Sequence, residues 1–154
     1  MKRDWNKYIN EQKKAECQLV SALNAYYYMT GKAIKYGSKK YMALIKLCKA
    51  EYGSAIYIHR VYERLGMVIL RAERYMWGFM GKKGLRLPII TNIDHKFYGL
   101  HSVAIVEHEP RTDSLRIPNL KFVTNGMGWI FREDFDAITT QKYSPCGPVL
   151  LGMR

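Results

Sequence analysis

The sequence predicts an α+β fold in which N-terminal helices pack on a C-terminal antiparallel β-sheet. Helix-like apolar segments fill the first part of the chain, and strand-like apolar runs fill the part after residue 85. The two kinds of segment do not alternate, which favours segregated helices and strands over a parallel βαβ arrangement. We therefore expect one domain over residues 1–154, with a helical half at about 10–66 and a β half at about 67–154.

Three helices are expected in the first half. Gly31 and Gly66 follow apolar segments and predict helix ends, because glycine readily adopts the left-handed conformation of a C-cap. Ser38 and Ser54 precede apolar segments and predict N-caps, because a serine hydroxyl can accept a hydrogen bond from a free helical N–H. The expected helices are 16–29, 41–50 and 54–65.

Short strands are expected in the second half. Residues 100–106 are apolar on both faces, which is typical of a central strand. Residues 110–113, Pro-Arg-Thr-Asp, predict a turn that returns the chain as a hairpin. Residues 132–138 predict a short helix. The expected strands are 67–70, 87–93, 100–109, 114–118, 128–131 and 148–153.

Composition excludes several classes of protein. With 154 residues, of which 48% are hydrophobic, the chain is long and apolar enough to bury a core. Its 25 Lys and Arg against 13 Asp and Glu give a net charge of +12, which favours an anionic partner such as nucleic acid or an acidic protein. Three cysteines without a CxxC pair predict neither a disulfide framework nor a cysteine-rich zinc site. No signal peptide or membrane-spanning run is evident, so we expect a cytoplasmic protein with free thiols.

Cys17 and His101 are the residues to which the sequence assigns chemistry. Cys17 lies at the start of the first expected helix, where the helix dipole is expected to lower its pKa and favour the thiolate. His101 opens the most apolar expected strand, where it would be held rigidly near the surface. Each residue taken alone is more often structural: a buried cysteine, or a histidine bonded to backbone.

Asn119 and Gln12 are candidate supporting residues. Asn119 follows the returning strand and could accept a hydrogen bond from an imidazole N–H. A two-residue turn would pair Asn119 with Ala104, on the face opposite His101, whereas a three-residue loop would pair it with Val103, on the same face. Gln12 could donate to an oxyanion together with the backbone N–H of Cys17. Asn92, Asp94 and Asn125 are held in reserve for the orienting role.

The order and spacing of five segments resemble a known family. They are Gln12 with 16–23, then 84–90, 99–106, 115–119 and 129–135. Together they are similar to the papain-like cysteine peptidases, above all the bacteriocin-processing branch that removes double-glycine leaders, and to its stand-alone relatives. The chain departs from that branch at Gln18, where the branch has glycine, and at Asn119, where it has aspartate and papain itself has asparagine. Gln12 is about one residue closer to the cysteine than is usual.

The resemblance implies a papain-like fold with a half-barrel sheet and a cysteine peptidase activity without metal or cofactor. Cys17 would be the nucleophile, His101 the general base, Asn119 the residue that orients the imidazole, and Gln12 part of the oxyanion hole. The substrate would be a peptide or protein. In such an enzyme, an alkylating reagent should modify Cys17 faster than it modifies Cys48 or Cys146.

Two alternatives remain open from the sequence. Lysines and arginines interleave with tyrosines over residues 13–75, which could bind phosphates and stack bases in a catalytically inactive module of the same fold. The plainer interpretation of that segment is a solvated helix face with tyrosines half-buried beneath it. Another acyl transfer, such as a transglutaminase-like reaction, would use the same Cys–His pair.

Overall fold

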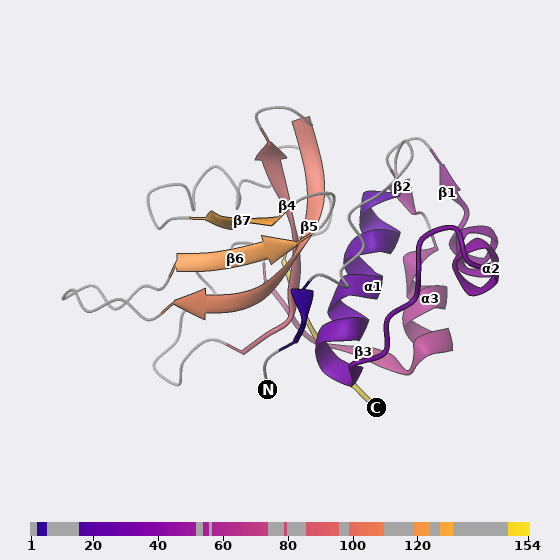
Figure 1. Cartoon of the computed structure of the whole chain (residues 1–154), viewed down its shortest axis with the longest axis horizontal. Coiled ribbons are helices and arrows are strands. Elements are labelled where there is room, and N and C mark those ends of the chain that lie inside the picture. The colour runs from indigo at the N-terminus through magenta and orange to yellow at the C-terminus, as the bar shows by residue number, and fades with distance from the viewer. Residues whose placement is uncertain are drawn as a thin grey trace.

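The computed structural model describes residues 3–5, 16–51, 54–55, 57–73, 79, 86–95, 99–109, 119–123, 127–130 and 148–154. It is an α+β structure, as predicted, with helices gathered on one side of an antiparallel sheet (Figure 1). The helices are α1 (Cys17–Thr30), α2 (Lys39–Cys48) and α3 (Ile58–Leu65). The strands are β1 (Ala50–Glu51), β2 (Ser54–Ala55), β3 (Met67–Ala72), β4 (Ile89–His95), β5 (Gly99–Glu109), β6 (Asn119–Val123), β7 (Met127–Ile130) and β8 (Val149–Met153).

The described strands form a two-stranded sheet, β1-β2, and a six-stranded sheet in the order β3-β8-β4-β5-β6-β7. The C-terminal strand β8 lies between β3 and β4, so the last residues of the chain join the strand that follows α3 to the rest of the sheet. β5 lies between β4 and β6, and its residues 102–106 are buried, which confirms the prediction of a central strand.

Three of the four predicted helix caps are confirmed, and the fourth, Ser54, is wrong. Gly31 and Gly66 adopt left-handed conformations with φ of 76° and 73°, and the Ser38 side chain accepts from the Tyr41 N–H at 3.2 Å. Ser54 does not cap α3. It lies in β2, paired with Glu51 of β1, and α3 begins only at Ile58, because Ser54 belongs to a strand pair instead of the first turn of a helix.

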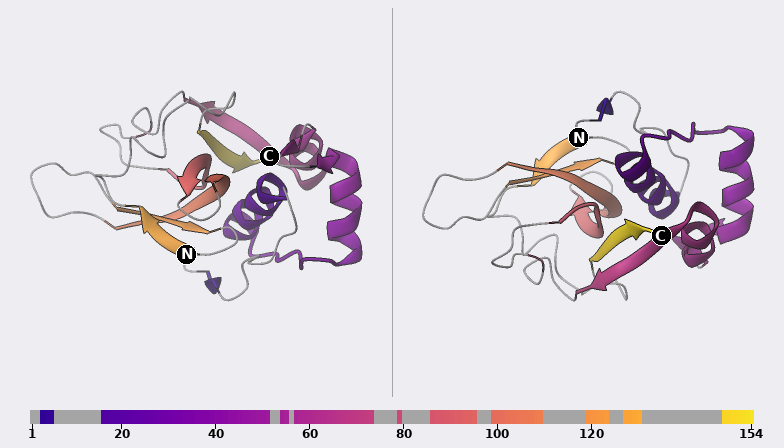
Figure 2. Two further views of the ribbon diagram at one scale, coloured as in Figure 1. Left: turned by 90° about the horizontal axis from the view of Figure 1, so that it is seen from above. Right: turned by 90° about the horizontal axis from the view of Figure 1, so that it is seen from below.

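α1 is the central element of the fold. Most of its residues are buried, including the polar Ser21 and Asn24, as expected for a helix that is covered on all sides. Seen from above, β3 and β8 lie on one side of α1 and β6 lies on the other, while α2 stands beyond it (Figure 2). Because α1 is enclosed by other elements, its first residue, Cys17, is held in a fixed position relative to the sheet.

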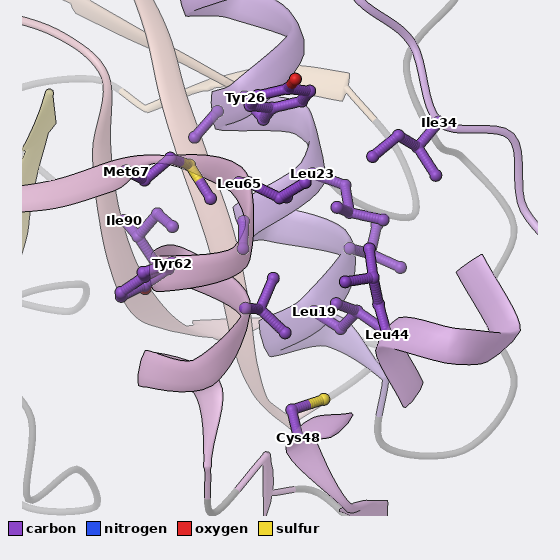
Figure 3. Close-up of a cluster of buried hydrophobic side chains, with 14 of the residues drawn as sticks. Leu19, Leu23, Tyr26, Ile34, Leu44, Cys48, Tyr62, Leu65, Met67 and Ile90 are labelled. Atoms are coloured by element: carbon purple, nitrogen blue, oxygen red, sulfur yellow. The ribbon is translucent and has the colours of Figure 1, made fainter. Parts of the chain in front are cut away.

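Two apolar clusters hold α1 from opposite sides. The larger joins it to α2, α3, β3 and β4 (Figure 3) and includes Leu19, Leu23, Leu44, Leu65 and Met67. The smaller joins it to β5 and β6. In the smaller cluster the ring of Trp5 packs edge-on against that of Tyr27, with 5.5 Å between the ring centroids. Trp5 Nε1 donates to the Glu107 carboxylate at 2.9 Å. Trp5 therefore contacts both α1 and β5.

A buried hydrogen bond ties the start of α1 to α2. The Tyr41 hydroxyl donates to the Glu16 carboxylate at 3.0 Å, and both residues are at least nine-tenths buried. Replacing Tyr41 with phenylalanine removes one donor from a buried carboxylate, so we expect Tyr41→Phe to lower the free energy of unfolding by about 1–3 kcal/mol. Urea unfolding measures this loss.

Tyr27→Phe is the matched comparison, because the Tyr27 hydroxyl donates to the Asp4 carbonyl oxygen at 2.8 Å in a less buried setting. We expect it to cost about 0.5–1.5 kcal/mol. A Tyr41→Phe protein as stable as the parent would contradict a stabilising role for the contact between Tyr41 and Glu16.

Candidate functional site

The site is centred on Cys17, the first residue of α1. Glu16 precedes it as N-cap without a side-chain capping bond, and the Cys17 side chain is buried, with 9% of its surface exposed. The backbone N–H groups of Ser102, Cys17 and Gln18 donate toward the sulfur. The helix start therefore surrounds this sulfur with peptide dipoles, which is an arrangement suited to developing negative charge.

The pKa of Cys17 differs from the sequence-based prediction. Burial raises the pKa of the thiol, and the opposing hydrogen bonds from the Ser102, Cys17 and Gln18 backbone do not overcome it. The expectation that the helix terminus would lower the pKa is thus wrong, since removal from water outweighs the dipole. Cys17 rests as a neutral thiol at pH 7 and needs a base to become a nucleophile.

The raised pKa has a measurable consequence. Because the thiolate is the form that reacts with iodoacetamide, the alkylation rate of Cys17 should rise with pH and reach half its maximum above about 8.5, the ordinary value for cysteine. Mass spectrometry of the Cys17 peptide over a pH series measures the midpoint. The same residue in urea-unfolded protein is the control and should show the ordinary midpoint; a native midpoint at or below the unfolded one would contradict this prediction.

β5 brings the His101 position to Cys17. His101 directly precedes Ser102, the strand residue whose N–H reaches the Cys17 sulfur, and its backbone pairs with Ile93 of β4. The start of α1 and the start of β5 thus meet, as the sequence interpretation required. The side chain of His101 lies outside the part of the chain that the structure describes, as do Gln12, Asn125 and Cys146.

Asn119 occupies a different place from the one predicted. It pairs with Glu109 at the far end of β5, eight residues beyond His101, or roughly 26 Å along the strand. Neither predicted register, with Ala104 or with Val103, occurs: Ala104 pairs with Val123 instead. A shift in register follows Ile105. The predicted turn at 110–113 and strand at 114–118 lie outside the residues that the structure describes. Asn119 is therefore not the neighbour of His101.

A pocket of about 120 Å³ opens at the junction of α1, α3 and the sheet; Cys17 itself does not line it, but Gln18, the next residue of α1, does. Gln18 of α1 and Ser102 of β5, two of the three residues whose N–H groups reach the sulfur, both line it. Asn92, a reserve candidate from the sequence, pairs with Ser102 across the strands and lines the same pocket. The further lining residues are Tyr62, Ile69, Ile90, Thr91 and Val149.

Sequence reasoning did not find most of this pocket. Tyr62 and Ile69 look like ordinary apolar residues of a helix and a strand, and Val149 lies near the opposite end of the sequence. No local pattern joins these positions, which come from α3, β3 and β8. Two lining residues do carry a signal in the sequence: Gln18, which replaces the glycine of the family that the sequence resembles, and Asn92, a reserve candidate for the orienting role.

The basic residues of the helical half lie on its surface. The side chains of Lys39, Lys40, Lys46, Lys49, Arg60 and Arg64 are exposed. Tyr26 and Tyr27 of α1, Tyr41 of α2 and Tyr62 of α3 are buried and offer no faces for stacking bases, whereas Tyr28, Tyr36 and Tyr57 are half-buried. This supports the interpretation of a solvated cationic face over buried tyrosines.

Among the described residues, no group of His, Cys, Asp and Glu could hold a metal ion, and Cys17 and Cys48 are free thiols. Nor is any helix in the described ranges long and apolar enough to cross a membrane. Neither a family model nor a curated protein matches the chain. The geometry around Cys17 is therefore the basis for assigning a function.

Proposed function

We propose that the chain is a papain-like cysteine peptidase with Cys17 as nucleophile and His101 as general base. One observation carries the proposal: the Cys17 sulfur, at the N-terminus of an enclosed helix, lies against the backbone of Ser102, the residue after His101. A nucleophile and a base on two rigid elements that meet at their starts would be held in one geometry through the reaction.

Because the pKa of Cys17 is raised, the proposed mechanism starts from a neutral thiol whose proton must be removed during the attack. His101 accepts the thiol proton as the sulfur attacks the carbonyl carbon of a peptide bond. The C–N bond then breaks and His101 returns the proton to the leaving amine, which leaves a thioester on Cys17. Water, deprotonated by His101, attacks the thioester and releases the acid and the thiol.

The oxyanion formed in each step would meet the start of α1. The N–H groups of Cys17 and Gln18 already donate toward the sulfur, so a carbonyl oxygen close to the sulfur would lie near the same donors. A contribution from the Gln12 side chain remains a prediction of the sequence.

The test is cleavage of a mixed peptide library by the full chain, with new termini identified by mass spectrometry. We expect new termini with the parent protein and none above background with His101→Ala. His108→Ala is the matched control, because His108 is an exposed residue of the same strand, seven positions away. A library left intact by the parent, or cleaved equally by His101→Ala, would reject the proposed peptidase.

The same variants also test whether His101 acts as the base for Cys17. His101→Ala should also slow iodoacetamide alkylation of Cys17 near neutral pH, because the base that helps to deprotonate the thiol is lost. If the alkylation rate of Cys17 did not change in His101→Ala, His101 would not be its general base.

A further inference from the structure

Five exposed cations follow one another along α2 and α3. Lys39 and Lys46 lie seven residues apart on α2, which is about two helical turns, so both lie on one side of the helix. Lys49 is the C-cap of the same helix. Arg60 and Arg64 lie about one turn apart on α3. All five side chains are exposed, and we call this set of residues the cationic stripe.

The ring of Tyr57, at the N-cap of α3, joins the two halves of the cationic stripe. Lys49 Nζ lies 5.3 Å and Arg60 Cζ 4.0 Å from the centroid of this ring. Arg60 also donates to the Leu47 carbonyl oxygen at 3.5 Å, which holds its guanidinium at the end of α2. The charges of the two helices therefore meet. Because the guanidinium of Arg60 is already ordered, less side-chain entropy is lost when it binds an anion.

The charge of this part of the chain is unbalanced. Residues 16–66 contain eight Lys and Arg but three Glu, of which Glu16 is buried. Glu63 is the one exposed acid described on α3. Within the described residues, no member of the cationic stripe forms an ion pair. Like charges held near one another repel, so an anion that bridges several of them would be favoured.

The length of the cationic stripe favours a polymer over a small anion. The stripe follows the 10 residues of α2, about 15 Å, and continues past Tyr57 for about one turn of α3. α2 stands at the outer edge of the helical side of the structure (Figure 2). A nucleic acid duplex carries one phosphate charge per about 1.7 Å of its axis, so it can meet several of these cations at once. A free phosphate ion would meet only one or two.

The aromatic rings of this region favour a duplex over a single strand. Binding of a single strand usually relies on exposed rings on which successive bases stack. The half-buried rings described here are engaged within the protein: Tyr28 stacks on Trp5, Tyr36 packs against Tyr41, and Tyr57 lies under two cations. A duplex needs no such rings, because its bases are already stacked and its phosphates face outward.

The stripe also lacks the groups that anchor a protein partner. Protein interfaces depend on a few aromatic or apolar side chains that become buried at their centre. Among the described residues of α2 and α3, Met42 is the one large apolar side chain that is exposed. A phosphate backbone, which presents charge without apolar surface, matches this face better than an acidic protein does.

We propose that the cationic stripe binds the phosphate backbone of a double-stranded nucleic acid without reading its base sequence. The inference does not rest on the proposed peptidase function, because no residue of the stripe adjoins the Cys17 sulfur or lines the pocket.

The test is fluorescence anisotropy of the full chain with labelled DNA and RNA duplexes of about 20 base pairs over a salt series. Five phosphate contacts predict that log K falls against log salt concentration with a slope of about −4.5. Arg64→Gln and Lys46→Gln should each reduce that slope by about 1 and weaken binding roughly fivefold near 0.1 M salt. Two duplexes of unrelated sequence should bind within about twofold of each other.

Arg86→Gln is the matched control. Arg86 is an exposed arginine that precedes β4 and lies outside the stripe, and its replacement removes the same charge as Arg64→Gln. Its affinity should stay within about twofold of the parent, with an unchanged slope. Binding of either duplex supports the proposal, and the comparison of DNA with RNA identifies the source of the phosphates.

Three outcomes would overturn the proposal. The first is no binding of either duplex at low salt. The second is an equal loss in all three variants, because net charge and not the stripe would then explain binding. The third is binding of poly-glutamate or of a single strand as tightly as the duplexes, because the face would then suit an acidic protein or unpaired bases.

Discussion

Replacing Cys17 with alanine is expected to lower the proposed peptide cleavage by roughly 10³-fold or more, because the covalent route is lost with the sulfur. The site also argues against partial rescue by serine. A hydroxyl ionises far less readily than a thiol, and the burial that already raises the pKa of Cys17 would disfavour an alkoxide still more. The measurement is the initial rate of cleavage of one peptide identified from the library.

Cys48→Ala is the control for this prediction. Cys48 ends α2, is fully buried in the large apolar cluster, and lies with its sulfur 3.8 Å from the Ile45 carbonyl oxygen. Its replacement should cost about 1 kcal/mol of stability while cleavage per folded molecule stays unchanged. Equal cleavage by Cys17→Ala and the parent would end the assignment of Cys17 as nucleophile.

The free energy of unfolding is expected to fall by about 2–5 kcal/mol in Leu23→Ala. Leu23 lies in the middle of α1 with 1% of its surface exposed, within the cluster that joins the helix to α2 and α3 (Figure 3). Truncation removes apolar burial and leaves a cavity that an enclosed helix cannot collapse to fill. Because α1 carries Cys17, the proposed peptide cleavage should fall at the same urea concentrations at which the helix unfolds.

Met42→Ala is the matched control for the core prediction. Met42 lies on α2 with 46% of its surface exposed, so its truncation should change stability by no more than about 0.5 kcal/mol. Both variants are measured by urea unfolding, with the slope of the transition compared to verify two-state behaviour. Similar losses in the two variants would mean that α1 is not packed as described.

The large elements of the fold were predictable because their signals are local. Gly31 needs a left-handed conformation, Ser38 provides a cap, and the apolar segment between Cys17 and Thr30 has few alternatives to a buried helix. The pairing of β1 with β2 was missed, since strands of two residues carry no period that could be recognised.

The partner of Asn119 was not predictable. A one-residue slip in a strand with one buried face exposes apolar side chains, which fixes the register. β5 is buried on both faces over residues 102–106, so its sequence lacks the alternation that would specify pairing. The irregular pairing after Ile105 precedes the pairing of Asn119 with Glu109, and no local pattern in the sequence marks that irregularity.

By itself the sequence determined that three helices precede an antiparallel sheet, that Cys17 lies at a helix start and that His101 lies near a strand start. These follow from residue-by-residue propensities and from glycine and serine at helix ends. Only the tertiary structure decided how Cys17 titrates, which residues line the pocket and where Asn119 lies. Desolvation, a cavity wall drawn from α1, α3 and four strands, and strand register each depend on residues far apart in the chain.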